Sequence, residues 1–357
     1  MNVRSRRHMS GGRGGNPQQA SSPNSQHQVP TGAAEVCEGG DSRYVGVVVV
    51  SRDSASPLRQ LLPRLSGSPA TVVVVDNRSE DDSVEVAAKA GVRVVRMPTN
   101  AGYSAACNEG ARVLGPSVGW IAFVNPDVAV CAGDLRRLTT DVPDDIWAIA
   151  PLTTTLDGRA QADVARPAPT PWFVAAMYMG LTRSKADVNG LKSSGGDRYY
   201  YTDVLSGSCL LVRRQRLDLV GGWDEAFFFN CEDIDVCVRI GMAGGRVAVD
   251  RGVRVAHHKA HSSSNVRDED RRLEGARAYA TYFHIHSSPW ETTLVAVAAY
   301  LGCVARHLVD RVLLRSRGSS GAFARYGLLL RVLWSDVRQA YLGRPPARPA
   351  HAVFLDP

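Results

Sequence analysis

Residues 44–77 read YVGVVVVSRDSASPLRQLLPRLSGSPATVVVVDN and carry the pattern of a strand, a helix and a second strand. Val45–Val50 is a continuous apolar run, which is typical of a parallel strand covered on both faces. Ser56–Leu65 has apolar residues at helical spacing, and Thr71–Val75 is another buried run. A strand, a helix and a strand in this order favour an α/β fold with a parallel sheet.

The alternation continues to residue 140. It predicts a helix over Ser79–Ala90, a strand over Val92–Met97, a helix over Ser104–Leu114, a strand over Trp120–Val124 and a short helix over Leu135–Thr140. We therefore expect a doubly wound sheet, in which ligands bind at the carboxyl ends of the strands. No Gly-x-Gly-x-x-Gly motif follows the first strand, so a dinucleotide cofactor is disfavoured. Residues 150–200 are rich in proline and polar residues and are expected to be mostly loop.

Polar residues follow several of these strands, where a ligand would bind. They are Ser51, Arg52, Asp53, Asp76, Asn77, Asn100, Asn125 and Asp127. The carboxylate of Asp76 could accept the imide N–H of uracil or thymine, or it could cap the turn before Ser79. Asp127 ends the sequence Asn-Pro-Asp, where it can reach a divalent cation that bridges a diphosphate, or simply complete a turn.

The segment Asn100–Asn108 reads NAGYSAACN, a glycine turn that opens a helix of small residues. Small residues let a ligand approach the helix N-terminus, where anions are favoured. A tight contact between this helix and the sheet is the alternative. That contact would account for Gly102 but not for both asparagines.

Residues 221–235 read GGWDEAFFFNCEDID and place three acids at the start of a helix. Glu232 and Asp235 are expected to share one face of it, while Asp233 points elsewhere. An inverting sugar transfer needs a general base for the acceptor hydroxyl and a cation that neutralises the departing diphosphate. We identify Asp233 as the candidate base. The alternative is that all three acids cap the helix and balance its dipole.

A second Val-rich strand ends on His257, and His258 follows it. A neutral imidazole is a good ligand for a transition metal such as Mn²⁺. A single histidine would suit a structural role, whereas a tandem pair in a chain with these acids favours metal binding. Lys259 could instead contact phosphate.

Both ends of the chain differ from its middle. Residues 1–40 are rich in Gly, Ser, Gln and Pro and predict a disordered tail that lacks the apolar stretch of a secretory signal. The net charge is +7, and residues 305–348 carry nine arginines against two aspartates, which gives the same +7. These arginines alternate with Leu, Val, Tyr and Trp, which favours a basic amphipathic helix on anionic lipids over a nucleic-acid site.

The longest apolar run of this region, Leu294–Ala305, is shorter than the roughly 20 residues that cross a bilayer. We therefore expect a cytoplasmic protein attached peripherally to the inner face of the plasma membrane. An ordinary helical pair packed on the core is the alternative. None of the seven cysteines forms a Cys-x-x-Cys pair, which is typical of reduced thiols in the cytosol. The expected organisation is an α/β domain over 41–265, a helical membrane-associating region over 266–345 and a tail over 346–357.

Taken together, the motifs of residues 44–265 resemble the family 2 inverting glycosyltransferases of the GT-A fold. The matching pieces are Ser51, Asp76-Asn77, Asn100-x-Gly102-Tyr103 with Asn108, Asn125-Pro126-Asp127, Ser206-Gly207-Ser208-Cys209 with Arg213, Gly222-Trp223-Asp224-Glu225, Glu232-Asp233-x-Asp235 and His257. The stretches LSGSCLLVRR and HHKAHS are similar to actinobacterial rhamnosyltransferases, which act on polyprenyl-diphosphate-linked N-acetylglucosamine to build the cell-wall linkage unit.

The resemblance implies a Rossmann-like nucleotide-diphospho-sugar transferase with a mixed sheet flanked by helices and a basic, amphipathic helical C-terminal extension. It implies a dTDP-rhamnose donor, a lipid-linked acceptor and a Mn²⁺ or Mg²⁺ ion held by Asp127 and His257. Asp233 would be the base, and Asp76 would contact the nucleotide base. The nucleotide-sugar site would comprise Ser51, Asp53, Asp76, Asn100, Gly102, Asn108, Asn125 and Glu232.

The chain departs from the family pattern at two positions. Asn125 stands where the family has aspartate and is a weaker metal ligand, and Trp223 stands where it has phenylalanine. Two other hypotheses stay open: a UDP-sugar donor, for galactofuranosyl or other hexosyl transfer, and a non-catalytic nucleotide-binding relative. No nucleic-acid partner is expected.

Overall fold

The computed structural model describes residues 44–66, 71–161, 163–182, 197–258, 268–313 and 322–346, all within one compact unit. The tail predicted over 1–40, nearly all of the tail predicted over 346–357, and Lys259 lie outside these residues. The same holds for Arg315, Arg317 and Arg348 among the nine arginines of the basic segment.

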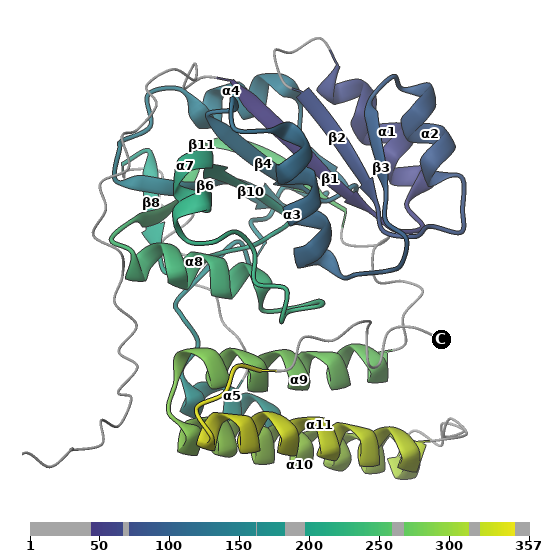
Figure 1. Cartoon of the computed structure of the whole chain (residues 1–357), viewed down its shortest axis with the longest axis vertical. Helices are drawn as coiled ribbons and strands as arrows, with labels where there is room; N and C mark the ends of the chain where they lie inside the picture. Colours follow the sequence, from purple (N-terminus) through teal and green to yellow (C-terminus); the bar gives the residue numbers. More distant parts are fainter. Residues whose placement is uncertain are drawn as a thin grey trace, which may run out of the picture. The chain divides into compact units, whose positions relative to one another are not determined.

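Nine strands of the described chain form one mixed sheet, which Figure 1 shows between two layers of helices. Eight follow one another in the order β3 (Arg93–Arg96), β2 (Thr71–Asp76), β1 (Val45–Ser51), β4 (Trp120–Val124), β10 (Cys209–Arg213), β6 (Ile146–Thr154), β11 (Arg246–His257) and β5 (Val128–Ala129); β8 (Tyr199–Thr202) also pairs with β11. The first four are parallel, whereas β10 runs antiparallel to both of its neighbours. The mixed α/β sheet that the resemblance implies is therefore confirmed.

Strand β1 is apolar along nearly its whole length because both of its faces are buried. Val47 and Val49 pack on one face with helices α1 (Ala55–Leu65), α2 (Ser83–Lys89) and α4 (Ala132–Thr139). Val48 packs on the other with α3 (Tyr103–Leu114), α7 (Arg214–Leu219) and α8 (Glu232–Met242). A strand buried on both faces has no polar alternation, as the sequence predicts.

Each element predicted up to residue 140 is present, with bounds shifted by at most four residues. The expectation of a mostly loop segment over 150–200 is only partly right. Strand β6 extends to Thr154, and the segment also contains β7 (Ala165–Arg166), which pairs with β9 (Val204–Leu205), and helix α5 (Pro171–Tyr178).

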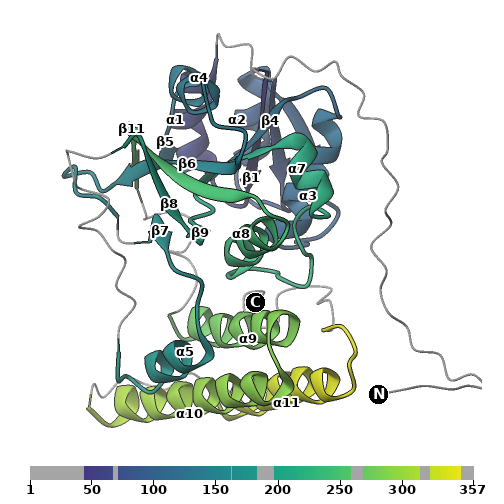
Figure 2. The same cartoon turned by 90° about the vertical axis from the view of Figure 1, so that its left-hand side faces the viewer.

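Four helices of the described chain form a separate layer: α5, α9 (Asp268–His286), α10 (Pro289–Leu313) and α11 (Ala322–Tyr341), as Figures 1 and 2 both show. Helix α5 packs on α10 so closely that a Cβ atom at Gly302 would lie 2.2 Å from the carbonyl oxygen of Tyr178. Tyr282 and Phe283 of α9 share a core cluster with Ile234 of α8, so this helical layer is packed onto the α/β part.

Helix α10 is longer than the apolar run Leu294–Ala305 from which its length was expected. Its segment Pro289–Val309 has 21 residues with a mean hydropathy of 1.5, so among the described helices it has the length and composition to cross a membrane. The sequence prediction considered only the uninterrupted apolar run and missed that the helix continues on both sides of it. Of its most apolar 18-residue window, 39% is buried, so this helix is covered only in part by the rest of the described chain.

Candidate active site

A cavity of about 1100 Å³ joins the carboxyl ends of the parallel strands to the helical layer. Of the predicted site residues, those that line it are Asp53, Asn100, Gly102, Asn125, Glu232, Asp233 and His257. Ser51, Asp76, Asn108 and Asp127 do not line it. The sheet therefore brings most of the predicted residues to one place, as expected for the switch point of such a fold.

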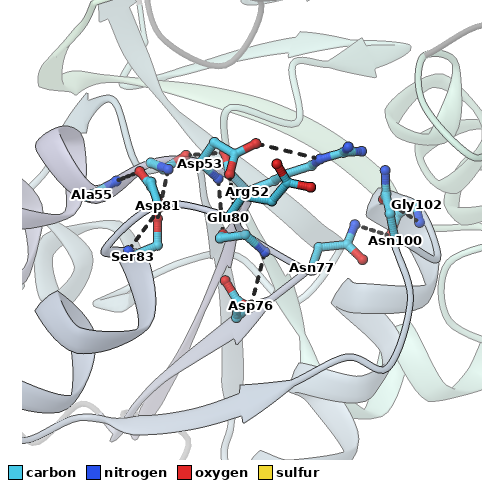
Figure 3. Close-up of polar contacts among 12 residues, drawn as sticks. Arg52, Asp53, Ala55, Asp76, Asn77, Glu80, Asp81, Ser83, Asn100 and Gly102 are labelled. Carbon is cyan, nitrogen blue, oxygen red and sulfur yellow. Dashed lines mark hydrogen bonds and ion pairs between the residues drawn. The ribbon is translucent and has the colours of Figure 1, made fainter. Parts of the chain in front are cut away.

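The loop after β1 forms one end of the cavity, and Figure 3 shows its polar contacts. The Asp53 carboxylate accepts the backbone N–H of Glu80 at 2.7 Å and lies 3.8 Å from the Arg52 guanidinium. The backbone N–H of Asp53 donates to the Ser79 hydroxyl at 3.0 Å. Asp53 has a φ of 48°, so these contacts hold a left-handed residue and join the loops after β1 and β2.

The loop before α3 is fixed by amide side chains. Asn77 donates to the carbonyl oxygen of Gly102 at 3.3 Å and accepts the backbone N–H of Ala101 at 2.9 Å. The Asn100 side chain accepts the N–H of Gly102. Gly102 has a φ of +87°, and a Cβ atom there would lie 2.7 Å from the carbonyl oxygen of Phe228, so only glycine fits.

Asp76 and Ser51 lie just beneath this end of the cavity. Asp76 is 3% exposed, and its Oδ2 accepts the backbone N–H of Ser79 at 3.2 Å. Neither its Oδ1 nor the Ser51 hydroxyl has a hydrogen-bond partner in the part of the chain that the structure describes. Because an unpaired buried polar atom is costly, both atoms have the character expected of ligand-binding groups.

Asn108 lies apart from the cavity, and its hydrogen bonds account for it without a ligand. Its side chain donates to the carbonyl oxygen of Trp223 and to the Glu225 carboxylate, both at 2.9 Å, and it accepts the N–H of Trp223. Gly222 passes so close that a Cβ atom there would lie 2.9 Å from Asn108 Oδ1. Asn108 therefore holds the Gly-Gly-Trp-Asp turn against α3, where sequence analysis had placed it in the nucleotide-sugar site.

Helix α8 presents Asp233 to the middle of the cavity. The chain enters this helix through Cys231 with a left-handed φ of 63°. The Asp233 carboxylate accepts the backbone N–H groups of Gly207 at 3.1 Å and Ile234 at 2.8 Å. The Arg166 guanidinium lies 3.3 Å from it, and the Asp233 side chain is 15% exposed. The carboxylate is thus fixed in position and still reachable from the cavity.

Asp235 does not share the cavity with Glu232, contrary to the expectation from helical spacing. Glu232 and Asp233 both line the cavity, whereas Asp235 is fully buried on the far side of α8. There it accepts hydrogen bonds from Arg239 and pairs with His286 of α9, whose Nε2 lies 2.8 Å away. The prediction failed because Glu232 is the first residue of the helix, where the entering chain sets its direction.

Glu232 is a buried carboxyl group beside a second acid. Its Oε2 has no hydrogen-bond partner among the described residues. Burial, and then the charge of Asp233, raise the pKa of Glu232 to about 8. Glu232 therefore keeps its proton at neutral pH.

Asp127 and His257 meet with the geometry of a cation site. Gln161 donates its amide N–H to the carbonyl oxygen of His257 at 2.9 Å, so its Oε1, 3.0 Å from Nδ1 of His257, accepts the proton of that nitrogen. In the neutral imidazole, Nε2 then carries a lone pair, and it faces Asp127 Oδ1 at 3.3 Å. Two acceptors that face each other at this distance suit a shared cation, which can be a proton or a metal ion.

This donor set fits a divalent ion that the substrate helps to hold. Among the residues described here, no group of three His, Cys, Asp or Glu side chains is arranged to hold a metal. Two protein ligands with diphosphate oxygens and water are a usual environment for Mg²⁺. The histidine and carboxylate also suit Mn²⁺.

Two residues of the site escaped sequence analysis, namely Gln161 and Arg166. Both lie between β6 and α5, in the segment expected to be loop. Arg166 belongs to β7, a strand of two residues that is too short to show a period. Only the density of polar residues before Pro167 could have indicated them.

Comparison with known proteins identifies the family. Residues 47–145 match the family described as Glycosyl transferase family 2. The chain is 30% identical over 307 residues to N-acetylglucosaminyl-diphospho-decaprenol L-rhamnosyltransferase of Mycobacterium tuberculosis, and the match covers 75% of this chain and 94% of that protein. The chain belongs to glycosyltransferase family 2. The predicted resemblance to family 2 rhamnosyltransferases is therefore confirmed, and the protein is a glycosyltransferase of the hexosyl-transferring class.

Two further proteins are similar to this family 2 glycosyltransferase. Rhamnosyltransferase WbbL of Escherichia coli is 29% identical over 149 residues, which cover 40% of this chain and 54% of that protein. A mannosyltransferase from Pyrobaculum calidifontis, solved with GDP-mannose and Mn²⁺, has 15% sequence identity and a TM-score of 0.48, with coverage of 84% of this chain and 86% of that one.

Proposed function

We propose that this glycosyltransferase moves L-rhamnose from dTDP-L-rhamnose to N-acetylglucosamine carried on a prenyl diphosphate. The main support is the match to a rhamnosyltransferase with that acceptor over 94% of its length. The position of Asp233 in the middle of one continuous cavity, between the strand ends and the helical layer, is consistent with a base that lies between donor and acceptor.

Asp233 would act as the general base of a single displacement. The acceptor hydroxyl oxygen attacks C1 of the rhamnose, and its proton passes to the Asp233 carboxylate. The bond between C1 and the diphosphate oxygen breaks, and the electron pair leaves with dTDP. Gly207 and Ile234 hold the carboxylate through their N–H groups, and Arg166 stabilises its negative charge before the proton arrives.

The leaving diphosphate would be stabilised at the other wall of the cavity. Asp127 and His257 are the residues that would hold a divalent ion, and a bound ion would supply charge neutralisation for the diphosphate. Gln161 fixes the tautomer of His257. Asn125, a neutral residue that lines the same wall, would contribute a weaker ligand or a hydrogen bond.

The nucleotide base would bind at the end formed by the loops after β1 and β2. The unpaired Oδ1 of Asp76 is an acceptor suited to the imide N–H of thymine, and uracil offers the same group. The unpaired Oδ1 therefore favours a base with a ring N–H donor over adenine or cytosine, and dTDP is proposed because of the rhamnosyltransferase relatives.

We further propose that the helical layer rests on the inner surface of the plasma membrane. Helices α10 and α11 expose several large apolar side chains, among them Val297, Leu301, Leu330 and Trp334 at 52%, 49%, 48% and 65%. Trp334→Ser should weaken binding to anionic phospholipid vesicles about tenfold. Met242→Ser, at a residue 77% exposed on α8, is the matched control and should have no effect.

A donor panel tests the proposed activity. The purified protein is given Mn²⁺ or Mg²⁺, a short-chain prenyl-diphosphate N-acetylglucosamine, and either dTDP-rhamnose or one of several UDP-sugars, and products are measured by mass. Addition of a deoxyhexose from dTDP-rhamnose, lost in EDTA, is the expected result. Transfer from a UDP-sugar alone would retain the fold and the base but exclude rhamnose as the donor sugar.

A further inference from the structure

The cavity does not end at Asp233 but continues onto the helical layer. There it is lined by arginine side chains from three helices: Arg271 and Arg272 of α9, Arg306 of α10 and Arg325 of α11. Among the described residues, the one carboxylate that lines the same stretch is Asp270. This end of the cavity therefore carries an excess of positive charge.

The arginines differ in how they are held. Arg325 is anchored by two acids, with nitrogen–oxygen distances of 3.6 Å to Glu269 and 3.3 Å to Asp270. Arg306 forms no ion pair with any carboxylate that the structure describes. Burial raises the pKa of the Cys303 thiol, and the positive charges of Arg272 and Arg306 oppose this rise. Both arginines therefore lie near Cys303. The charge of Arg306 is thus available to a ligand.

A continuous set of contacts links this arginine cluster to the reaction centre. Arg166 contacts Asp233 and lines the cavity together with Tyr279 of α9. Tyr279 packs edge-on against Tyr178, with ring centroids 6.2 Å apart. Tyr178 in turn lies against Gly302 of α10, next to Cys303. A ligand that fills the cavity can therefore reach both Asp233 and the arginines.

The position of the cluster decides which anion it suits. The diphosphate of the donor belongs at the strand ends, on the side of Asp127 and His257. The base stands between donor and acceptor, so an anionic group on the helical side belongs to the acceptor. Arginine is the side chain best suited to the oxygens of a phosphate group.

We propose that Arg272 and Arg306 bind the phosphate groups that join the acceptor sugar to its lipid. This inference rests on the proposed function, because it takes the acceptor to be a sugar on a prenyl diphosphate. Leu328 lines the cavity beside the arginines and is 37% exposed, so an apolar chain could leave the cavity there toward the exposed side chains of α10 and α11. The helical layer would thus recognise the acceptor and would not serve only as an anchor.

The test compares two acceptors. One is a short-chain prenyl-diphosphate N-acetylglucosamine, and the other is octyl N-acetylglucosaminide, which keeps the sugar and an apolar chain but has no phosphate. Arg306→Gln and Arg272→Gln should raise the KM of the first acceptor about tenfold or more relative to the second, with the KM of the donor unchanged. Arg331→Gln, at an exposed arginine of α11 that does not line the cavity, is the matched control.

Three results would overturn the inference: an equal loss on both acceptors, a rise in the KM of the donor, or no change.

Direct binding of farnesyl diphosphate, measured by calorimetry, tests the arginines even if rhamnose is not the sugar transferred. Binding by the wild-type chain that Arg306→Gln weakens supports the site, whatever the donor. If both substitutions instead weaken only the binding of phosphatidylglycerol vesicles, the arginines contact lipid headgroups and the acceptor site is excluded. Thermal unfolding confirms that each variant is folded.

Discussion

The strand ends and the helical layer build the two sides of one cavity in different ways. At the strand ends, polar side chains are fixed by hydrogen bonds to neighbouring loops, as Asp53 and Asn77 are. On the helical side, arginines project from three separate helices, and at least Arg306 forms no ion pair with an acid of the described residues. The donor side is therefore preorganised by the sheet, whereas the acceptor side depends on how the helices pack.

The largest effect is expected where the two sides meet. Asp233→Asn should lower the rate of transfer by about 10²–10⁴, because the amide cannot take the proton of the acceptor hydroxyl. Donor binding, measured by calorimetry, should be nearly unchanged, since Asp233 stands on the acceptor side of the sugar. A variant with near wild-type turnover would exclude Asp233 as the base.

The donor side can be tested without touching a metal ligand. Gln161→Leu removes the group that fixes the tautomer of His257 and should weaken Mn²⁺ binding about 10- to 100-fold. Calorimetric or electron paramagnetic resonance titration of Mn²⁺, in the presence of dTDP, measures this effect. If Gln161→Leu bound the ion as tightly as the wild-type chain, Asp127 and His257 would not form the metal site.

The link between the two sides is the buried pair of Asp235 and His286. His286→Phe keeps the ring against Tyr282 but removes the hydrogen bond, and it should lower the free energy of unfolding by about 1–3 kcal/mol. Chemical denaturation measures this loss. Because Arg239 still holds Asp235, the transfer rate should fall less than for Asp233→Asn. An unchanged stability would show that α8 and α9 do not depend on this bond.

The last expected effect concerns pH and Glu232. In the unfolded chain this group ionises near its ordinary pKa of 4.5, whereas in the folded protein its pKa is about 8. Between these values the folded state keeps a proton that the unfolded state has lost, so the stability that is present below pH 4.5 falls as the pH rises toward 8. Glu232→Gln cannot ionise and should lack this part of the decline.

Thermal denaturation at pH 5 and pH 8, without metal or nucleotide, measures this pH-dependent loss of stability. The Tm of the variant minus the Tm of the wild-type chain should be higher at pH 8 than at pH 5, by roughly a few degrees. An equal difference at both values would mean that Glu232 titrates normally.

The sequence predicts the donor side much better than the acceptor side, for physical reasons. Strands buried on both faces, such as β1, leave an unmistakable apolar run, and the residues after them must meet at one edge of the sheet. Asn108 shows the limit, because the same motif that fits a ligand site serves here to hold Trp223. Arg166 and Gln161 lie in short elements without a period, and their roles depend on contacts with residues far along the chain.

The helical layer was predicted only in outline. The sequence predicts a helical region over 266–345, but it could not show that α5 joins the same layer or that arginines of three helices line one cavity. The boundary expected at 265/266 remains a prediction. In space, α5 packs with α10, on the other side of that boundary.

A crystal structure of the Asp233→Asn variant with Mn²⁺, dTDP and a short-chain prenyl-diphosphate N-acetylglucosamine tests the division of the cavity most directly. We expect the thymine beside Asp76, an acceptor hydroxyl within hydrogen-bond distance of residue 233, and the acceptor diphosphate against Arg272 and Arg306. A nucleotide diphosphate bound to these arginines, or an acceptor bound at the strand ends, would contradict this division.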